Sequence, residues 1–307
     1  MRIAALAAGG VGGYFGARLA QAGHDVFFIA RGAHLAAMRK DGLKIESVHG
    51  DLRLPKVNVT DKPAEIGPVD IVLFAVKLWD TEKAAETANP LLSANTRVIT
   101  LQNGVDSYER IAPIVGAAHA IPGTTYVFTV IERPGVIKQS SKVQSIVCGR
   151  IDGKPDAILL KFAEAGNAAG IAVTISDNIQ LERWKKFVFL AANSGATALT
   201  RATTGEVLTD PDMTRMFMAI MRETAAVGRA TGVPIEAGFE DERLAYAQKN
   251  LVSNMRASMA NDLNSGNRLE LDWLAGTISR LGKELNVPTP VNDTIYAALK
   301  PFRMGRR

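Results

Sequence analysis

The sequence predicts an α/β protein in which a doubly wound parallel sheet is followed by an all-helical domain. Two observations carry this prediction. Apolar strand runs alternate with helical patterns to about residue 175, and only helical patterns follow. At 307 residues the chain is also long for a single core, so two domains are expected. We therefore place the α/β domain at residues 1–175 and the helical domain at residues 176–307.

A glycine-rich turn follows the first strand. The apolar run Ile3 to Leu6 leads into Ala7-Ala8-Gly9-Gly10-Val11-Gly12-Gly13-Tyr14-Phe15-Gly16, and a helical pattern covers residues 17–22. This order is typical of a dinucleotide-binding (Rossmann) domain, in which Gly9 lets the backbone approach a pyrophosphate and Gly12 and Gly16 let the helix pack on the sheet. Ala7 replaces the first glycine of the motif, and we expect its φ angle to stay negative. The residues predicted to bind the cofactor here are Ala7, Ala8, Gly9, Gly10, Val11 and Gly12; the alternative is a tight turn with no nucleotide.

The residue after the second strand indicates which dinucleotide is bound. A strand is predicted at Val26 to Ala30, after the turn Gly23-His24-Asp25, and Arg31 follows directly. An NAD site normally carries an acidic residue near this point, whereas a guanidinium can pair with a 2′-phosphate. We therefore predict NADP (NADPH) as the cofactor, with Arg31 binding its 2′-phosphate. An ordinary surface arginine at a strand end is the alternative.

The remaining elements of the α/β domain follow in alternation. Strands are predicted at 69–76, 97–101 and 119–121, and helices at 81–92 and 104–114. Three shorter β runs, at 124–132, 135–139 and 143–147, turn at Pro134-Gly135 and are expected to form a hairpin extension at the sheet edge. A helix at 155–170 and a strand at 171–175 complete the domain.

Polar residues follow two of these strands. Lys77 ends the run at 69–76, and Asn103 follows the run at 97–101. In the usual strand order the first, fourth and fifth strands are neighbours, and ligands bind beyond their carboxyl ends. We therefore expect the glycine turn, Lys77 and Asn103 to converge on one crevice and to bind the cofactor. The alternatives are a solvated lysine and a helix N-cap.

Start and stop signals define helices in the second domain. Asp210-Pro211 is an N-cap followed by a proline at the first helical position, and Thr231-Gly232-Val233-Pro234 ends that helix. A last long helix is predicted from Arg268 to Leu285 because leucine and isoleucine recur along one face. We expect the active site between the two domains.

Two charged residues of the helical domain are candidates for catalysis. Lys186 lies in a helix that becomes apolar on every side, so its ammonium needs a partner or a cleft. The alternative is a surface pair with Glu182, four residues earlier. Glu270 has its own alternative, because Asn267 followed by glutamate at the third helical position is a capping box.

The amino-acid composition limits the classes of protein to which this chain can belong. The chain is 47% hydrophobic and 22% charged, with a formal charge of +5, so we expect a globular enzyme and no nucleic-acid partner. No apolar run is long enough to span a membrane, and the short N-terminal run leads straight into the glycine turn, so we reject a secretion signal and expect the cytoplasm. Cys148 is the single cysteine and is predicted to be a buried strand residue; we expect no disulfide and no metal site.

Together these motifs resemble the 2-dehydropantoate 2-reductase, or ketopantoate reductase, family. The resemblance covers nearly the whole chain in order and spacing: the glycine turn, Arg31, Lys77, 101–105, 184–186, Ser258-Met259 with Asp262, 270–272 and 287–292. It implies a helical domain of the 6-phosphogluconate dehydrogenase C-terminal type. It further implies NADPH-dependent reduction of 2-dehydropantoate to (R)-pantoate, a step toward pantothenate and coenzyme A.

The resemblance also implies roles for individual residues. Lys186 would be the general acid, Glu270 and Ser258 would bind substrate, and Asn103 and Lys77 would lie between nicotinamide and substrate. This fits the chemistry, because negative charge grows on the carbonyl oxygen during reduction and a positioned ammonium can stabilise and protonate it. Leu190 and Ser194 stand where the family pattern carries asparagines that contact substrate. The predicted substrate-binding set is Asn103, Lys186, Ser194, Ser258 and Glu270.

Two other functions stay open from the sequence. One is a related reductase or dehydrogenase that acts on another branched 2-oxo acid, which the change at Leu190 and Ser194 suggests. The other is a non-catalytic NADP-binding sensor, against which the presence of both Lys186 and Glu270 argues. In each enzymatic case the partner is a small 2-oxo acid. A homodimer through the helical domain also stays open.

Overall fold

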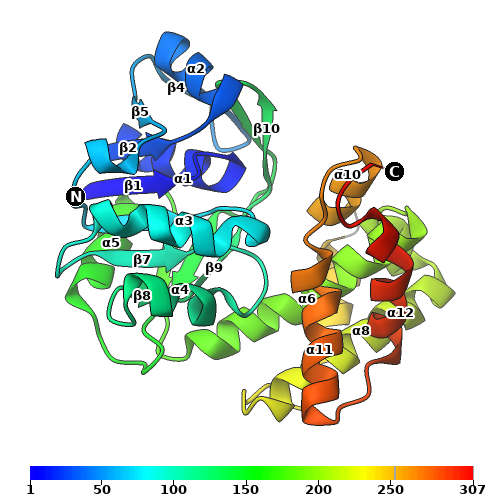
Figure 1. The fold of residues 1–307 in the computed structure, drawn as a ribbon. Helices are drawn as coiled ribbons and strands as arrows, with labels where there is room; N and C mark the ends of the chain where they lie inside the picture. Colours follow the sequence, from blue (N-terminus) through cyan, green and yellow to red (C-terminus); the bar gives the residue numbers. More distant parts are fainter. Residues whose placement is uncertain (252–253, 307) are drawn as a thin grey trace. The chain divides into compact units, whose positions relative to one another are not determined.

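The structure, a computed structural model, describes residues 1–251 and 254–306 and divides into two compact units, Met1–Ile179 and Gln180–Arg307. A six-stranded parallel sheet with the strand order β5-β2-β1-β6-β7-β8 organises the first unit (Figure 1). This order confirms the doubly wound sheet, with β1, β6 and β7 as neighbours. Its strands are β1 (Arg2–Leu6), β2 (Asp25–Ile29), β5 (Asn58–Thr60), β6 (Ile71–Phe74), β7 (Arg97–Thr100) and β8 (Ala120–Ile121).

Both faces of this sheet are buried, because alternate residues of a strand point to opposite sides. Ile3 and Ala5 of β1 belong to one apolar cluster, and Ala4 and Leu6 belong to another. Residues of α1 and α5 join the first cluster, and residues of α3 and α4 join the second. A strand covered on both faces is largely apolar, which is why β1, β2, β6 and β7 were recognisable in the sequence, whereas β5 was not predicted. The helices of this unit are α1 (Gly10–Gln21), α2 (Gly32–Asp41), α3 (Thr81–Ala88), α4 (Ser107–Val115) and α5 (Ala157–Ala168).

The predicted hairpin extension at the sheet edge is wrong in its placement, because those runs form two further sheets. The first has the order β10-β11-β3-β4 and contains β3 (Leu43–Ser47), β4 (Leu52–Leu54), β10 (Thr129–Arg133) and β11 (Val136–Gln139). The second has the order β13-β12-β9 and contains β9 (Gly123–Tyr126), β12 (Ser145–Cys148) and β13 (Ala172–Ile175). Cys148 is a buried strand residue as predicted, and burial raises the pKa of its thiol to about 12.

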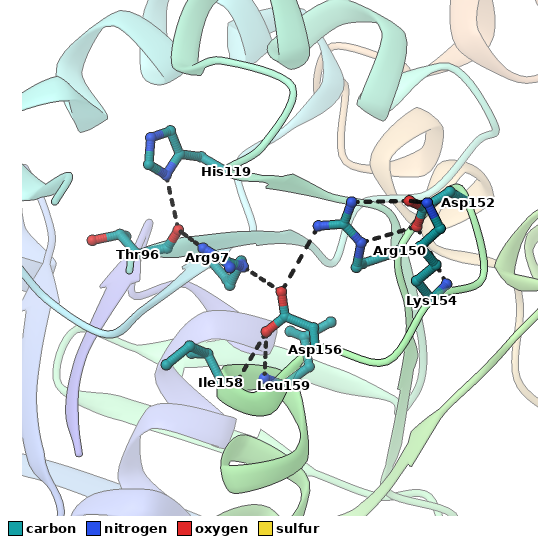
Figure 2. A network of polar contacts seen from close by, with 9 residues as sticks. All are labelled: Thr96, Arg97, His119, Arg150, Asp152, Lys154, Asp156, Ile158 and Leu159. Atoms are coloured by element: carbon teal, nitrogen blue, oxygen red, sulfur yellow. Dashed lines mark hydrogen bonds and ion pairs between the residues drawn. The ribbon is translucent and has the colours of Figure 1, made fainter. Parts of the chain in front are cut away.

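A cluster of hydrogen bonds and ion pairs joins the amino-terminal end of β7 to the start of α5 (Figure 2). Arg97, the first residue of β7, donates through Nε to Oδ2 of Asp156 at 2.7 Å, and Asp156 also accepts from two backbone N–H groups at the start of α5. Burial alone would raise the pKa of Asp156, but the bonds from Arg97 and from the helix N–H groups hold it below its usual value. The cluster lies at the opposite end of the strand from the glycine turn and Asn103, so we interpret it as structural.

The second unit is built from helices. The start of α8 confirms the predicted cap, because Asp210 accepts from the N–H groups of Asp212 and Met213 and Pro211 is the first helical residue. The predicted start of the last long helix is wrong, because this helix begins at Ala275 and not at Arg268. The helices are α6 (Ile179–Thr200), α7 (Thr204–Thr209), α8 (Pro211–Ala230), α9 (Phe239–Asn250), α10 (Ser258–Asn264), α11 (Ala275–Leu285) and α12 (Pro290–Leu299). Across residues 1–251 and 254–306, no helix combines the length and apolar character that crossing a membrane requires.

Candidate active site

The glycine turn joins β1 to α1, and its first residue has an unusual backbone. Ala7 has a φ angle of 71°, in the left-handed region that alanine avoids. The expected negative φ is therefore wrong. The reason is that neighbours fix the peptide that follows Ala7: the N–H of Ala8 donates to the Ile29 carbonyl at 2.8 Å, and Gly12 lies against the Ala7 carbonyl. Such strain persists only where the surrounding structure imposes it.

The glycines of α1 have the packing role that the motif predicts. A Cβ on Gly12 would lie 2.4 Å from the carbonyl oxygen of Ala7, and one on Gly16 would lie 2.7 Å from the ring of Phe28. A Cβ on Gly9, in contrast, would meet no atom within 4 Å. The helix therefore approaches the sheet closely at Gly12 and Gly16, while the backbone at Gly9 faces open space.

The amino-terminal end of α1 has the properties of an anion site. Gly9 is the N-cap residue and provides no side-chain cap, and the first turn of α1 contains no acidic residue. The first N–H groups of a helix have no partner within the helix and carry a partial positive charge. An uncapped helix end beneath the open space at Gly9 fits the pyrophosphate of a dinucleotide.

Arg31 lies at the carboxyl end of β2, next to the glycine turn. It is the N-cap residue of α2 and its side chain is exposed. Because β2 pairs with β1 in parallel, the loops after these two strands share one edge of the sheet. The guanidinium is therefore available at the edge where a ribose phosphate would be recognised, and its role there stays a prediction.

Lys77 and Asn103 follow β6 and β7 at the same edge. Gln102 joins the two loops, since its Nε2 donates to the Val76 carbonyl at 3.0 Å and to the Thr81 hydroxyl at 2.8 Å. Lys77 is exposed, with its Nζ 5.5 Å from the centre of the Trp79 ring. Asn103 is half-buried and is not the N-cap of α4, because that helix begins at Ser107 after Asp106. The N-cap alternative for Asn103 is therefore wrong, and its cofactor and substrate roles stay predictions.

In the second unit, Lys186 and Glu270 interact electrostatically. Burial lowers the pKa of the Lys186 ammonium to about 8, and the negative charge of Glu270 opposes this shift by raising it. The carboxylate that acts on Lys186 is thus Glu270, not the Glu182 of the surface-pair alternative. A lysine that retains partial exposure and whose pKa lies well below its usual value is typical of functional sites.

The neighbouring lysine has a different environment. Lys185 Nζ lies 2.8 Å from Oε1 of Glu236, an exposed carboxylate, and 5.6 Å from the centre of the Phe239 ring. Its charge is therefore held by a surface ion pair. Lys185 is therefore engaged by a surface carboxylate, whereas Lys186 interacts with the buried Glu270.

Glu270 is buried and does not cap a helix. It precedes a short 3-10 turn, Leu271–Trp273, and makes no side-chain capping bond. Asn267 is held elsewhere, because its N–H donates to the Asp262 carbonyl at 2.8 Å and its side-chain amide lies 3.3 Å from the Asp262 carboxylate. The capping-box alternative is therefore wrong, and the Glu270 carboxylate remains close enough to act on Lys186.

The other predicted substrate residues lie in two environments. Ser258 is the first residue of α10 and is exposed. Ser194 on α6 is fully buried, and its hydroxyl makes no hydrogen bond with the described residues. Asn193, one residue earlier, accepts from the Thr204 hydroxyl at 2.9 Å, so its side-chain oxygen is engaged within the helical unit. The substrate contacts of Ser194 and Ser258 stay predictions.

Nothing in the sequence patterns singled out His34, although the structure places it against the glycine turn. Its Nε2 lies 2.9 Å from the Ala8 carbonyl, and its Nδ1 accepts from the Gly135 N–H at 3.1 Å. The one available signal was its position three residues after Arg31, in the loop and helix that follow β2.

A parallel sheet whose first strand leads through an uncapped glycine turn into a helix is the architecture of the dinucleotide-binding class of proteins. Comparison with family models gives the family. Ketopantoate reductase PanE/ApbA matches residues 3–153, and its C-terminal model matches residues 178–303. The chain belongs to the ketopantoate reductase family.

Individual proteins are also similar to this chain, in sequence or in fold. An uncharacterised oxidoreductase of Bacillus subtilis (strain 168) is 28% identical over 98% of this chain and 99% of its own. The crystal structure of 2-dehydropantoate 2-reductase from Geobacter metallireducens GS-15 is 28% identical, with a TM-score of 0.92 over 98% of this chain and 99% of that one. The ternary structure of a D-mandelate dehydrogenase with NADH and anilino(oxo)acetate has the same fold at 24% identity, with a TM-score of 0.90 over 99% and 98% of the two chains.

Proposed function

We propose that this protein catalyses the NADPH-dependent reduction of 2-dehydropantoate to (R)-pantoate. The observation that carries the proposal is the Lys186–Glu270 pair, because burial places the pKa of the lysine at about 8 while the glutamate favours its charged form. A sensor of dinucleotides would need neither residue. The relatives named 2-dehydropantoate 2-reductase support the choice of substrate.

The glycine turn and Arg31 would hold the dinucleotide. The N–H groups at the start of α1 would bind the pyrophosphate over Gly9, and Arg31 would pair with the 2′-phosphate. When bound, the reduced nicotinamide supplies the hydride. Lys77 and Asn103, at the ends of β6 and β7, would border the nicotinamide.

Lys186 would act on the oxygen of the substrate. As the C2 carbonyl is reduced, its oxygen gains negative charge, which the Lys186 ammonium stabilises and then protonates from Nζ. A pKa near 8 suits this task, because the group is still mainly protonated at neutral pH and yet releases its proton readily. Glu270 would keep Lys186 charged before the reaction or bind the substrate hydroxyl.

A second candidate is reduction of a more apolar branched 2-oxo acid. Leu190 carries no polar group, and the hydroxyl of Ser194 is enclosed, so α6 offers fewer amides to a substrate hydroxyl than the family pattern does. A site built to bind a hydroxyl rejects analogues that lack it by about 10⁴–10⁵-fold, whereas an apolar wall discriminates by only about 10–200-fold. We expect this chain to fall in the weaker range.

The test is a comparison of kcat/KM for 2-dehydropantoate and for 2-oxo-3,3-dimethylbutanoate, which lacks the 4-hydroxyl, each with NADPH and with NADH. Turnover of 2-dehydropantoate with a preference well below about 10⁴-fold is expected. A larger preference would show that other residues restore the missing contacts. Binding of a dinucleotide without turnover of any 2-oxo acid would support the sensor and overturn the enzymatic proposal.

Cofactor choice is tested separately, because the D-mandelate dehydrogenase of the same fold was solved with NADH. Removing one charge-assisted contact costs about 1.5–3 kcal/mol, or roughly 10- to 150-fold in affinity. Arg31→Ala should therefore weaken NADPH by that factor and leave NADH unchanged in a fluorescence titration. Equal affinities of the wild-type protein for the two cofactors would contradict the preference for NADPH.

A further inference from the structure

His34 lies near the amino-terminal end of α2, and its side chain bonds two other segments of the first unit. Its Nε2 is 2.9 Å from the carbonyl oxygen of Ala8 in the glycine turn. Its Nδ1 is 3.1 Å from the N–H of Gly135, in the turn between β10 and β11. The first bond thus reaches the predicted cofactor-binding turn, and the second reaches a different sheet of the same unit.

The two bonds fix which ring nitrogen carries the proton. A backbone N–H can only donate, so Nδ1 of His34 accepts from Gly135 and Nε2 must carry the hydrogen that it donates to Ala8. The Gly135 turn is itself held, because its carbonyl accepts from the Lys44 N–H at 2.9 Å. The imidazole is half-buried, and burial lowers its pKa, which favours the same neutral form. His34 therefore presents a directed donor to the Ala8 carbonyl.

This donor acts next to the most strained residue of the turn. Ala7 has a φ of 71°, which alanine adopts at a cost that glycine does not have. Ala8 is held on both sides, by its N–H bond to Ile29 at 2.8 Å and by the bond from His34 to its carbonyl. Without the second bond, the peptide between Ala8 and Gly9 loses its fixed orientation, and the conformation of Ala7 is then supported from Ala8 only through the bond of the Ala8 N–H to Ile29. Ala7 can then relax more readily toward a negative φ.

We propose that His34 is a positioning residue that holds the Ala7 turn in its left-handed conformation, so that the backbone at Gly9 is ready for a dinucleotide pyrophosphate. The inference rests on the proposed dinucleotide binding for its purpose, but the conformational role can be measured without a cofactor. It also explains how this chain tolerates alanine at a position where the motif has glycine. The hydrogen bond from the His34 imidazole to the Ala8 carbonyl thus stabilises a conformation that is strained at Ala7.

Two substitutions separate the bonds of His34. In His34→Gln the side-chain amide reaches the position of Nε2 and keeps a donor for Ala8, whereas in His34→Asn the shorter side chain reaches only the position of Nδ1 and keeps an acceptor for Gly135. Ala7→Gly removes the strain, so Ala7→Gly combined with His34→Asn should suppress the defect. His49→Asn is the matched control, because His49 is an exposed histidine of the same unit whose ring bonds the Ser141 carbonyl, at 3.2 Å, away from the Ala7 turn.

The first measurement is hydrogen exchange of the Ala8 amide in the cofactor-free protein, since that N–H bonds Ile29 only while the turn is closed. We expect His34→Asn to speed this exchange about tenfold, which corresponds to about 1.4 kcal/mol, and His34→Gln to stay within about threefold of wild type. In the Ala7→Gly background, His34→Asn should change the rate by less than about threefold. His49→Asn should have no effect.

The second measurement is the NADPH dissociation constant of the same variants, which should follow the same order. Unchanged Ala8 exchange in a folded His34→Asn, equal effects of Asn and Gln, or no rescue by Ala7→Gly would each overturn the inference. If His34→Asn does not fold, exchange in His34→Gln with and without Ala7→Gly decides it: rates within about threefold of each other support the inference, and a larger separation overturns it. A wild-type protein that binds neither NADPH nor NADH would refute the proposed function, while the exchange rates would still decide the role of His34.

Discussion

Two adjacent lysines on α6 carry the same formal charge but differ in chemistry. Lys185 is bonded to Glu236 at 2.8 Å, while burial brings the pKa of Lys186 to about 8. Lys186→Ala should lower kcat by roughly 10²–10⁴-fold and leave NADPH binding nearly unchanged, because the ammonium is needed for the reaction and not for the cofactor. Lys185→Ala is the matched control and should keep most of the activity. If Lys186→Ala keeps its rate in steady-state assays, Lys186 is not the acid.

The pKa of Lys186 also predicts how the rate depends on pH. A general acid must be protonated, so kcat should be highest below pH 8 and fall as the pH rises through about 8. The charge of Glu270 raises this pKa, so Glu270→Gln should move the falling limb of the profile to lower pH. The measurement is a kcat profile from pH 6 to 10 at saturating cofactor. A falling limb that stays in place in Glu270→Gln would contradict coupling of the two groups.

The sequence predicted the structural role of some individual residues and not of others. The close packing at Gly12 and Gly16 followed from the motif, because tight helix–sheet contact requires glycine there whatever the rest of the fold does. Ala7 could not be predicted in the same way. Its left-handed φ depends on a bond to Ile29 and on an imidazole from α2, and neither contact is visible in the local sequence.

At the scale of elements, helix α1 allows two glycines to be compared. Gly9→Ala should fold normally, with a stability change within about 1 kcal/mol, because its φ is −75° and its Cβ meets no atom. It should nevertheless weaken NADPH by roughly tenfold or more, because a methyl group would occupy the space above the turn. Gly12→Ala should destabilise the protein by about 1–3 kcal/mol, since its Cβ would clash with the Ala7 carbonyl.

Thermal unfolding and NADPH titration of the two variants provide the check. The expected pattern is loss of affinity without loss of stability for Gly9→Ala, and loss of both for Gly12→Ala. Unchanged NADPH affinity in Gly9→Ala would show that the cofactor does not approach the backbone there.

The elements that the sequence predicted correctly are those whose pattern is set locally. Buried parallel strands such as β6 are apolar throughout, and the Asp210 cap is a local bond, so both were recognisable. The start of the last helix was not. A leucine stripe runs through residues 268–285, but Asn267 is held by Asp262 and Leu269 donates to the Arg303 carbonyl, so distant contacts keep the first part of that stripe out of the helix. Short strands such as β5, with three residues, are likewise specified by their partner rather than by their own pattern.

At the scale of the whole molecule, the first unit has the features of an independent domain. Both apolar clusters that cover its main sheet are built from residues between Met1 and Ile175, and all three sheets lie within Met1–Ile179. The residues predicted to bind the dinucleotide lie in this unit, whereas Lys186 and Glu270 lie in Gln180–Arg307. Binding and chemistry are therefore assigned to different parts of the chain.

This division predicts the behaviour of a fragment. Residues 1–179 expressed alone should unfold cooperatively and bind NADPH within about tenfold of the full chain, because the fragment keeps its core, the glycine turn, Arg31 and His34. It should have no reductase activity, since it lacks the proposed acid and its glutamate. Circular dichroism during heating, NADPH titration and an activity assay test the three points, with the fragment carrying Gly9→Ala as the control for specific binding. A cooperatively folded fragment that does not bind NADPH would show that the second unit contributes to the cofactor site.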